Sequence, residues 1–348
     1  MTVSLTSLPT SLSIATDGVG TIDSLMVHTI EEFSLVGAVV AIGTAGEVPE
    51  IHTYGLANPA TGRVMTAADR FKIASLSKPV TAEAILVLVR QGRLGLDDRL
   101  VEVLPGTARS VDDRVATIEL RHLLQHSAGW DRSLSIDPFF ATVDEIDELL
   151  NGRNVVIDDC VVVADAMLER PLQFDPGSRF AYSNLGYCWL GRVLEDTVGT
   201  SYEDAVHALV PETVGMSLDE TDVTVRYQIV PSEEQYLTNR PDIVAPAGGW
   251  IADAAQYFRF ASRPIDPTIL EQPPFATENQ HFGLGWRVWD LDERTVLTHY
   301  GAMPGVFSVV IRHEQGPLFV ALFNGRPPND EETFRFLLDA ILTLPAWQ

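Results

Sequence analysis

The stretch Ser75-Leu-Ser-Lys-Pro-Val-Thr-Ala-Glu-Ala-Ile-Leu-Val-Leu-Val-Arg-Gln-Gly92 passes from a polar start into a long apolar segment. Apolar residues between Val80 and Gln91 fall on more than one face of a helix, and Gly92 supplies a stop signal. A helix that is apolar all round is buried. We therefore expect a deeply buried helix that begins close to Ser75.

Strand-like runs lie toward the two ends of the chain, and helical patterns lie between them. The expected strands are residues 35–43, 50–55, 281–291, 295–299, 306–312 and 318–323. The expected helices, besides the one after Ser75, are residues 21–33, 117–125, 159–169, 183–198, 252–261 and 330–342. This distribution predicts an α/β (α+β) fold, with one antiparallel sheet built from both chain ends, flanked by terminal helices and carrying an inserted helical region.

The same pattern predicts the domain organisation. We expect a loose Ser/Thr-rich lead-in over residues 1–18 and a single catalytic domain over residues 19–348. Its sheet region comprises residues 19–74 plus 281–348, and its helical region residues 75–280. A cleft at the junction of the two regions is the expected site. Within the helical region, the acidic segment 131–159 resembles a surface excursion.

Charge and composition exclude several classes of partner. The chain has 348 residues, of which 48 are acidic and 24 basic, for a formal net charge of −24. Such a charge repels phosphate backbones and anionic membrane surfaces, so we expect neither nucleic acid nor a membrane as partner. No apolar run of about 18 residues occurs, and the N-terminus lacks a positive charge before an apolar stretch. We expect a cytoplasmic protein that acts on a small molecule; its oligomeric state stays open.

The two cysteines, Cys160 and Cys188, are too few for a disulfide framework, and their spacing cannot establish a single bridge. We expect two buried free thiols.

The first motif that carries chemistry is Ser75-Leu-Ser-Lys78. Residues three apart on a helix share a face, so Ser75 and Lys78 would be neighbours. A serine hydroxyl needs a nearby group to take its proton, and a lysine whose pKa is lowered by burial can do so. Taken alone, Ser75 could equally be a helix N-cap.

Two further motifs follow in order along the chain. Tyr182-Ser-Asn184 offers a hydroxyl to share the serine proton and an amide that can accept from Lys78 while donating to a substrate carbonyl. We expect the nearby lysine to favour the phenolate form of Tyr182. His299-Tyr-Gly301 lies on an expected strand, where glycine allows close approach to a ligand. Chance occurrence of all three motifs together is about 0.01 or less.

In these motifs the chain resembles the β-lactamase-related serine hydrolases, which include class C β-lactamases, DD-peptidases, D-aminopeptidases and esterases. The stretches Leu123-Leu-Gln-His-Ser-Ala-Gly129, Pro176-Gly177 and Ala247-Gly-Gly249 also resemble the family, and the resemblance covers residues 20–345.

The resemblance implies a role for each motif residue. Ser75 would be the acylated nucleophile, with Lys78 and Tyr182 as the acid/base pair. Asn184, His299, Gly301 and Ala302 would contact the substrate, and the backbone N–H groups of Ser75 and Ala302 would form the oxyanion hole. No metal or cofactor is implied. His126, within the Leu123–Gly129 stretch, is expected to be structural, and core packing is the favoured role for Trp130, Trp250, Trp286 and the Phe139-Phe140 pair.

The chain departs from many β-lactamases at His299, where they carry a lysine. Lysine holds a β-lactam carboxylate, whereas histidine is largely neutral at pH 7. We therefore expect a carboxylesterase-like hydrolase. The alternatives are a D-amino-acid peptidase or amidase, a weak β-lactamase, an acyltransferase that uses the same acyl-enzyme, and a non-hydrolytic penicillin-binding or sensing module.

Overall fold

The computed structural model describes residues 21–153, 155–221, 223–224, 226–227, 240–276, 279–291, 294–314 and 316–347, apart from the side chains at 143 and 346. The expected lead-in over residues 1–18 lies outside the described residues, as do residues 228–239.

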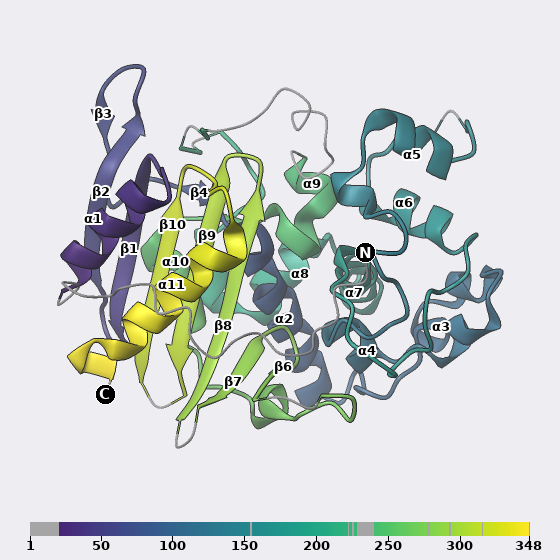
Figure 1. Ribbon diagram of the computed structural model, residues 1–348. Coiled ribbons are helices and arrows are strands. Elements are labelled where there is room, and N and C mark those ends of the chain that lie inside the picture. The colour runs from purple at the N-terminus through teal and green to yellow at the C-terminus, as the bar shows by residue number, and fades with distance from the viewer. Residues whose placement is uncertain are drawn as a thin grey trace.

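One eight-stranded antiparallel sheet forms the centre of the molecule (Figure 1). Its strands, in spatial order, are β3 (Arg63–Val64), β2 (Glu50–Asn58), β1 (Gly37–Thr44), β10 (Pro317–Phe323), β9 (Val306–His313), β8 (Arg294–Met303), β7 (Arg287–Leu291) and β6 (Gln280–Phe282). Strand β1 pairs with β10, so the two chain ends meet inside the sheet. The predicted fold class is confirmed.

The expected strand 281–291 is in fact two strands. Gly283 N donates to Trp286 O, and Gly285 has a φ of +83°, so the chain turns between β6 and β7. A side chain at Gly285 would also meet Ala82 of the central helix. The residues of this turn are buried, so the apolar pattern continues through it. The sequence pattern therefore does not show where β6 ends and β7 begins.

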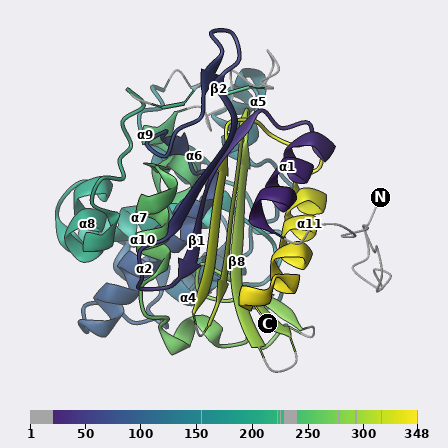
Figure 2. The ribbon, with the colours of Figure 1, turned by 90° about the vertical axis from the view of Figure 1, so that its left-hand side faces the viewer.

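Helices cover both faces of the sheet (Figure 2). On one face lie the terminal helices α1 (Ile22–Glu32) and α11 (Asp330–Thr343), and on the other lie α2 (Ser77–Arg90) and α10 (Ala254–Ala261). Side chains of β1 alternate between the two resulting cores: Val39 and Ala41 pack toward α2, and Ala38 and Val40 toward the terminal helices. As expected from its sequence, α2 is buried along most of its length.

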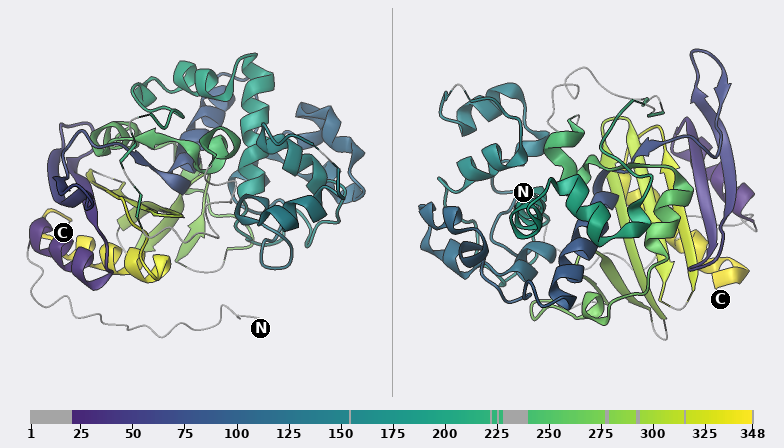
Figure 3. Two further views of the ribbon diagram at one scale, coloured as in Figure 1. Left: turned by 90° about the horizontal axis from the view of Figure 1, so that it is seen from above. Right: turned by 180° about the vertical axis from the view of Figure 1, so that it is seen from behind.

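The helical region lies beside the sheet, with α2 between the two (Figures 1 and 3). Its helices are α3 (Leu100–Val103), α4 (Leu120–Leu124), α5 (Val143–Leu149), α6 (Cys160–Met167), α7 (Asn184–Val198), α8 (Tyr202–Leu209) and α9 (Pro241–Val244). Helix α7 packs against α2, α4, α6 and α8. A small second sheet pairs β4 (Phe71–Lys72) with β5 (Ile251–Ala252).

The segment 131–159 is not the surface excursion that its acidity suggests. Phe139 is 1% exposed, and Ile146, Leu149 and Leu150 are also buried in the main core. The acidic residues occupy the outer face of α5 while the apolar ones anchor the segment. The segment is therefore held firmly enough to present side chains to a site.

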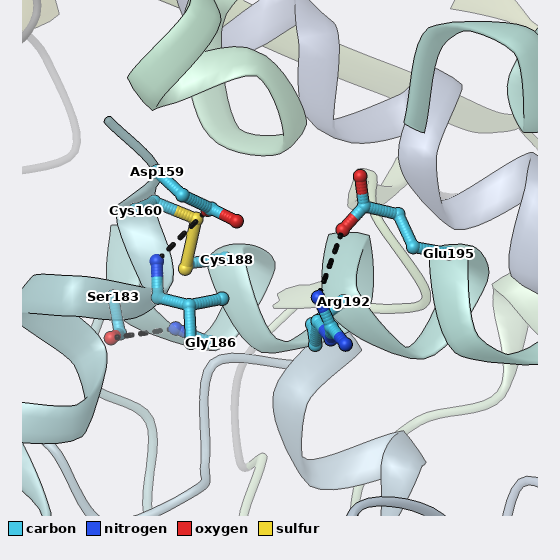
Figure 4. Close-up of a disulfide and its surroundings, with 8 residues drawn as sticks. Asp159, Cys160, Ser183, Gly186, Cys188, Arg192 and Glu195 are labelled. Atoms are coloured by element: carbon cyan, nitrogen blue, oxygen red, sulfur yellow. Dashed lines mark hydrogen bonds and ion pairs between the residues drawn. A yellow bond between two sulfur atoms is a disulfide. The ribbon is translucent and has the colours of Figure 1, made fainter. Parts of the chain in front are cut away.

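Cys160 and Cys188 form a disulfide, which corrects the expectation of free thiols (Figure 4). Cys160 opens α6, Cys188 lies in the second turn of α7, and their Cα atoms are 5.9 Å apart. Both residues are buried, as expected. The pairing of α6 with α7 brings the two side chains together, and the sequence alone does not reveal that pairing. Disulfides persist mainly in oxidising compartments, so the bond weighs against the expected cytoplasmic location, which stays a prediction.

None of the helices in the described part of the chain is long and apolar enough to cross a membrane.

Candidate active site

Ser75 lies in the 3₁₀ turn Ala74–Leu76 that leads into α2. Ala74 has a φ of +48°, a left-handed conformation that is uncommon for a residue with a side chain. Residues 71–74 and 76–86 are all buried, whereas Ser75 is partly exposed. The turn thus leaves Ser75 as the one partly exposed residue of an otherwise buried stretch.

The amine of Lys78 is fully buried behind Ser75. Lys78 Nζ lies 3.2 Å from Ser75 Oγ, and it donates to Asn184 Oδ1 at 2.8 Å and to Ala247 O at 2.7 Å. Burial lowers the pKa of Lys78 well below its usual value, and the nearby Asp137 carboxylate opposes this shift only in part. A neutral amine at this distance can accept the proton of the Ser75 hydroxyl.

Tyr182 hydrogen-bonds to the side chain of Ser75, and Lys78 Nζ lies 5.0 Å from the centre of its ring. Burial raises the pKa of Tyr182 even though the bond to Ser75 lowers it, so the phenol stays protonated. The expectation of a favoured phenolate is therefore wrong, because desolvation outweighs the influence of a lysine that is itself largely neutral. A protonated Tyr182 has a proton that it can donate.

Asn184 is the first residue of α7, where the side chain of the preceding Ser183 caps the helix through Gly186 N. Its Oδ1 accepts from Lys78, as expected, and its Nδ2 donates to Asp137 Oδ2 at 3.0 Å. One of the two Nδ2 hydrogens of Asn184 is thus used in the bond to Asp137. The other is the hydrogen that the expected contact with a substrate carbonyl would use.

Gly301 lies on β8 against the turn that carries Ser75. A Cβ atom at this position would approach Ile73 O to 2.6 Å and Ser75 N to 2.8 Å, so only glycine allows the strand this close. Ser308 on β9 pairs with Gly301 on β8. Its hydroxyl donates to Ile73 O at 2.7 Å, which ties both strands to the Ser75 turn. Ala302 follows directly on β8, and its part in the expected oxyanion hole stays a prediction.

His299 is buried beside these groups, 4% exposed. Its Nδ1 donates to Tyr300 O at 2.8 Å, and its Nε2 has no hydrogen-bond partner among the described residues. Burial lowers the pKa of His299 to about 3, and Lys78 adds to this shift whenever its amine is protonated. The imidazole is therefore neutral over the physiological range and offers Nε2 as a hydrogen-bond acceptor.

Aromatic side chains form one wall of the site. The ring of Phe282 lies edge-on to Tyr182 and His299, with centroids 5.9 Å away in each case, and it stacks on Phe180 at 4.9 Å. His126 stacks on Tyr182 at 4.2 Å, and its Nδ1 accepts from Ser183 N at 3.1 Å. His126 thus packs against Tyr182 and holds the backbone of Ser183, which agrees with its expected structural role.

Three residues near the site are absent from the sequence prediction. Asp137 contacts Asn184, Arg132 lies 4.9 Å over the ring of Tyr182, and Phe282 forms the aromatic wall. No local motif marks them. Trp130, Trp250, Trp286 and Phe139, by contrast, lie in the main core, as favoured from the sequence.

The fold and this arrangement define a serine hydrolase of the β-lactamase/transpeptidase-like architecture. A model of the Beta-lactamase family matches residues 22–343, so the chain belongs to that family, and the predicted resemblance is confirmed.

The proteins and solved structures that this chain resembles have names that indicate several activities. The chain is 26% identical to "Penicillin-binding protein 4" of Amycolatopsis lactamdurans over 80% of this chain and 77% of that protein. It is 32% identical to "Esterase EstB" of Burkholderia gladioli over 60% of this chain and 53% of the esterase. The structure of "EstCE1, a hydrolase with promiscuous acyltransferase activity" shares the fold with a TM-score of 0.72 at 20% identity, covering 92% of this chain and 97% of EstCE1. A D-amino acid amidase from Ochrobactrum anthropi does so with a TM-score of 0.69 at 19% identity, over 92% and 98% of the two chains.

We predict that Gly301→Ala lowers turnover by about 100-fold, the usual loss when one oxyanion donor is displaced, because the new methyl group pushes the Ser75 turn away from β8. Steady-state kinetics on folded protein measure the loss. Gly43→Ala is the matched control: it also lies on a sheet strand, but its Cβ would come no closer than 3.5 Å to any neighbour. Equal activity of the two variants would contradict the close approach at Gly301.

Proposed function

We propose that the protein hydrolyses a small-molecule ester or amide through an acyl-enzyme on Ser75, with carboxylesterase-like activity as the main function. The observation that carries the proposal is the convergence of a buried amine and a protonated phenol on one partly exposed hydroxyl.

In this mechanism Ser75 Oγ attacks the carbonyl carbon while its proton passes to Lys78 Nζ. The oxyanion that forms lies against the backbone N–H groups of Ser75 and Ala302. The tetrahedral intermediate then breaks its bond to the leaving alcohol or amine, which takes a proton from the Tyr182 hydroxyl. The ammonium of Lys78 returns a proton to Tyr182. Attack of water on the acyl-enzyme, by the same proton route, releases the acid and restores Ser75.

The surroundings of the site favour a neutral, apolar ester. The imidazole of His299 is neutral and cannot hold a carboxylate by charge, and the protein's net charge of −24 disfavours anionic substrates at long range. Phe282 and Phe180 give the site an apolar wall that suits an aliphatic or aromatic group. The resemblance to the Burkholderia gladioli esterase points in the same direction.

An amidase that acts on amino-acid derivatives is the second candidate. His299 Nε2 is a buried acceptor without a partner among the described residues, and it would suit an N–H group of such a substrate. Turnover of neutral p-nitrophenyl esters and of D- and L-amino-acid amides, compared on one preparation, separates the two. Product analysis with an added alcohol detects acyl transfer, and an adduct without product release would indicate a sensing module.

We predict that Ser75→Ala lowers kcat for a p-nitrophenyl ester by at least about 10³-fold, because no nucleophile remains. Circular dichroism should show an unchanged fold, since Ser75 is partly exposed and alanine removes only its hydroxyl. Ser262→Ala, which removes a hydroxyl that donates to Phe258 O at the end of α10, is the control and should keep full activity. Turnover by Ser75→Ala close to that of the wild type would refute the assignment.

We also predict that His299→Lys increases the rate of acylation by a penicillin by about tenfold relative to a neutral ester at pH 7, because a charge-assisted bond to the carboxylate contributes about 1.5–3 kcal/mol. Stopped-flow acylation of both substrates measures the ratio. His299→Gln, which brings no charge, should leave it unchanged. A ratio that is the same in all three proteins would show that this position does not select for substrate charge.

A further inference from the structure

The amide of Asn184 lies between two groups that fix its orientation. Asp137 Oδ2, 3.0 Å from Nδ2, belongs to a carboxylate and can only accept, so the amide must turn its N–H group toward Asp137. The carbonyl oxygen Oδ1 then necessarily faces Lys78 Nζ, 2.8 Å away. Without a strict acceptor at position 137, an asparagine amide could turn over.

This orientation decides what the neutral amine of Lys78 can do. A neutral amine has two hydrogens and one lone pair. Ala247 O at 2.7 Å is a strict acceptor and takes one hydrogen, and Asn184 Oδ1 takes the other. The lone pair is left for the Ser75 hydroxyl at 3.2 Å. If the Asn184 amide turned over, its N–H would compete with Ser75 for that lone pair.

We propose that Asp137 is a positioning residue of the reaction, which holds the Asn184 amide so that the lone pair of Lys78 is directed at the Ser75 hydroxyl. This inference rests on the proposed function and deepens it. Asp137 contacts neither Ser75 nor a reacting atom, so it acts through Asn184.

Asp137 is itself well anchored for this role. Its Oδ1 accepts from Phe139 N at 3.2 Å and caps the short 3₁₀ helix Pro138–Phe140, whose Phe139 is buried in the core. Its side chain is only 12% exposed, and Arg132 Nη1 lies 3.4 Å from Oδ2. The carboxylate is thus fixed by a backbone N–H on one oxygen and by two side chains on the other.

Asp137 and Arg132 also act on Lys78 with opposite signs. The carboxylate of Asp137 raises the pKa of Lys78 and the guanidinium of Arg132 lowers it, while burial lowers it most. The other groups that face the amine are Tyr182 and Tyr187, whose phenols are protonated, and His126 and His299, whose imidazoles are neutral. Asp137 and Arg132 are thus the two residues whose charge contributes to this pKa, and replacing either one removes its contribution.

The test compares Asp137→Ser with the wild type in kcat/KM for a p-nitrophenyl ester between pH 5 and 9. Serine can still cap residues 138–140 but is too short to reach Asn184. We expect kcat/KM per titrated Ser75 to fall by about 10–100-fold, the range for losing one hydrogen bond to a charged group, mainly in kcat. Lys78 must be neutral to act as the base, so kcat/KM falls when the pH drops below the pKa of Lys78. This fall is the acid limb of the profile, and it should move to lower pH because the loss of Asp137 lowers that pKa.

Two further variants complete the design. Arg132→Met should move the acid limb in the opposite direction, to higher pH. Asp266→Ser is the matched control: Asp266 likewise caps a 3₁₀ helix, Pro267–Leu270, and pairs with an arginine, Arg90. Arg90 ends α2, whereas Ser75 lies at the start of that helix, so Asp266 is away from the site. This variant should leave the pH profile unmoved. Counting active sites with a fluorophosphonate corrects each rate for misfolded protein.

Two results would overturn the positioning role. One is an activity of Asp137→Ser, per titrated site, within twofold of that of the wild type. The other is a loss of activity that leaves the acid limb of the pH profile of kcat/KM at the same pH. The proposed function fails separately. If Ser75→Ala keeps its turnover, the acyl-enzyme itself is wrong. If Ser75→Ala is inactive while Asp137→Ser matches the wild type, only the role of Asp137 is wrong.

Discussion

The site depends on the burial of one amine. Lys78 Nζ is removed from water, where a lysine would be charged, and is surrounded by a hydroxyl, an amide and a backbone carbonyl. Burying an isolated ammonium is costly, so the pKa of this group falls instead and the neutral base is stabilised. The reactivity expected of Ser75 follows from this desolvation.

Each layer of the fold contributes to that burial. Helix α2 carries Lys78 between the sheet and the helical region, α7 supplies Asn184, and the turn Ala245–Gly249 supplies the carbonyl of Ala247. Behind them, Thr81 donates to Pro246 O and bonds to Tyr202, which in turn accepts from Trp250, so the turn is held against α2. From the other side, β8 reaches the Ser75 turn only because residue 301 is a glycine.

The sequence was sufficient for those features that local patterns encode. The continuous apolar runs of β1, β9 and β10 predict the sheet, and the apolar patterns of the helices predict the terminal helices and the inserted region. Three ordered motifs predict the residues that gather around Lys78. The sequence was insufficient for features that depend on contacts between distant parts of the chain. The Cys160–Cys188 bond depends on the pairing of α6 with α7, the protonation of Tyr182 on its burial, and the role of Asp137 on a capped turn 47 residues before Asn184 in the chain.

The most direct test of the account is to react the protein with a fluorophosphonate, determine its intact mass and map the modified peptide. The account predicts one adduct per chain, located on Ser75, since this is the hydroxyl next to the neutral amine of Lys78. An adduct on another residue, or no adduct on protein shown to be folded, would contradict the claim that the buried lysine activates Ser75.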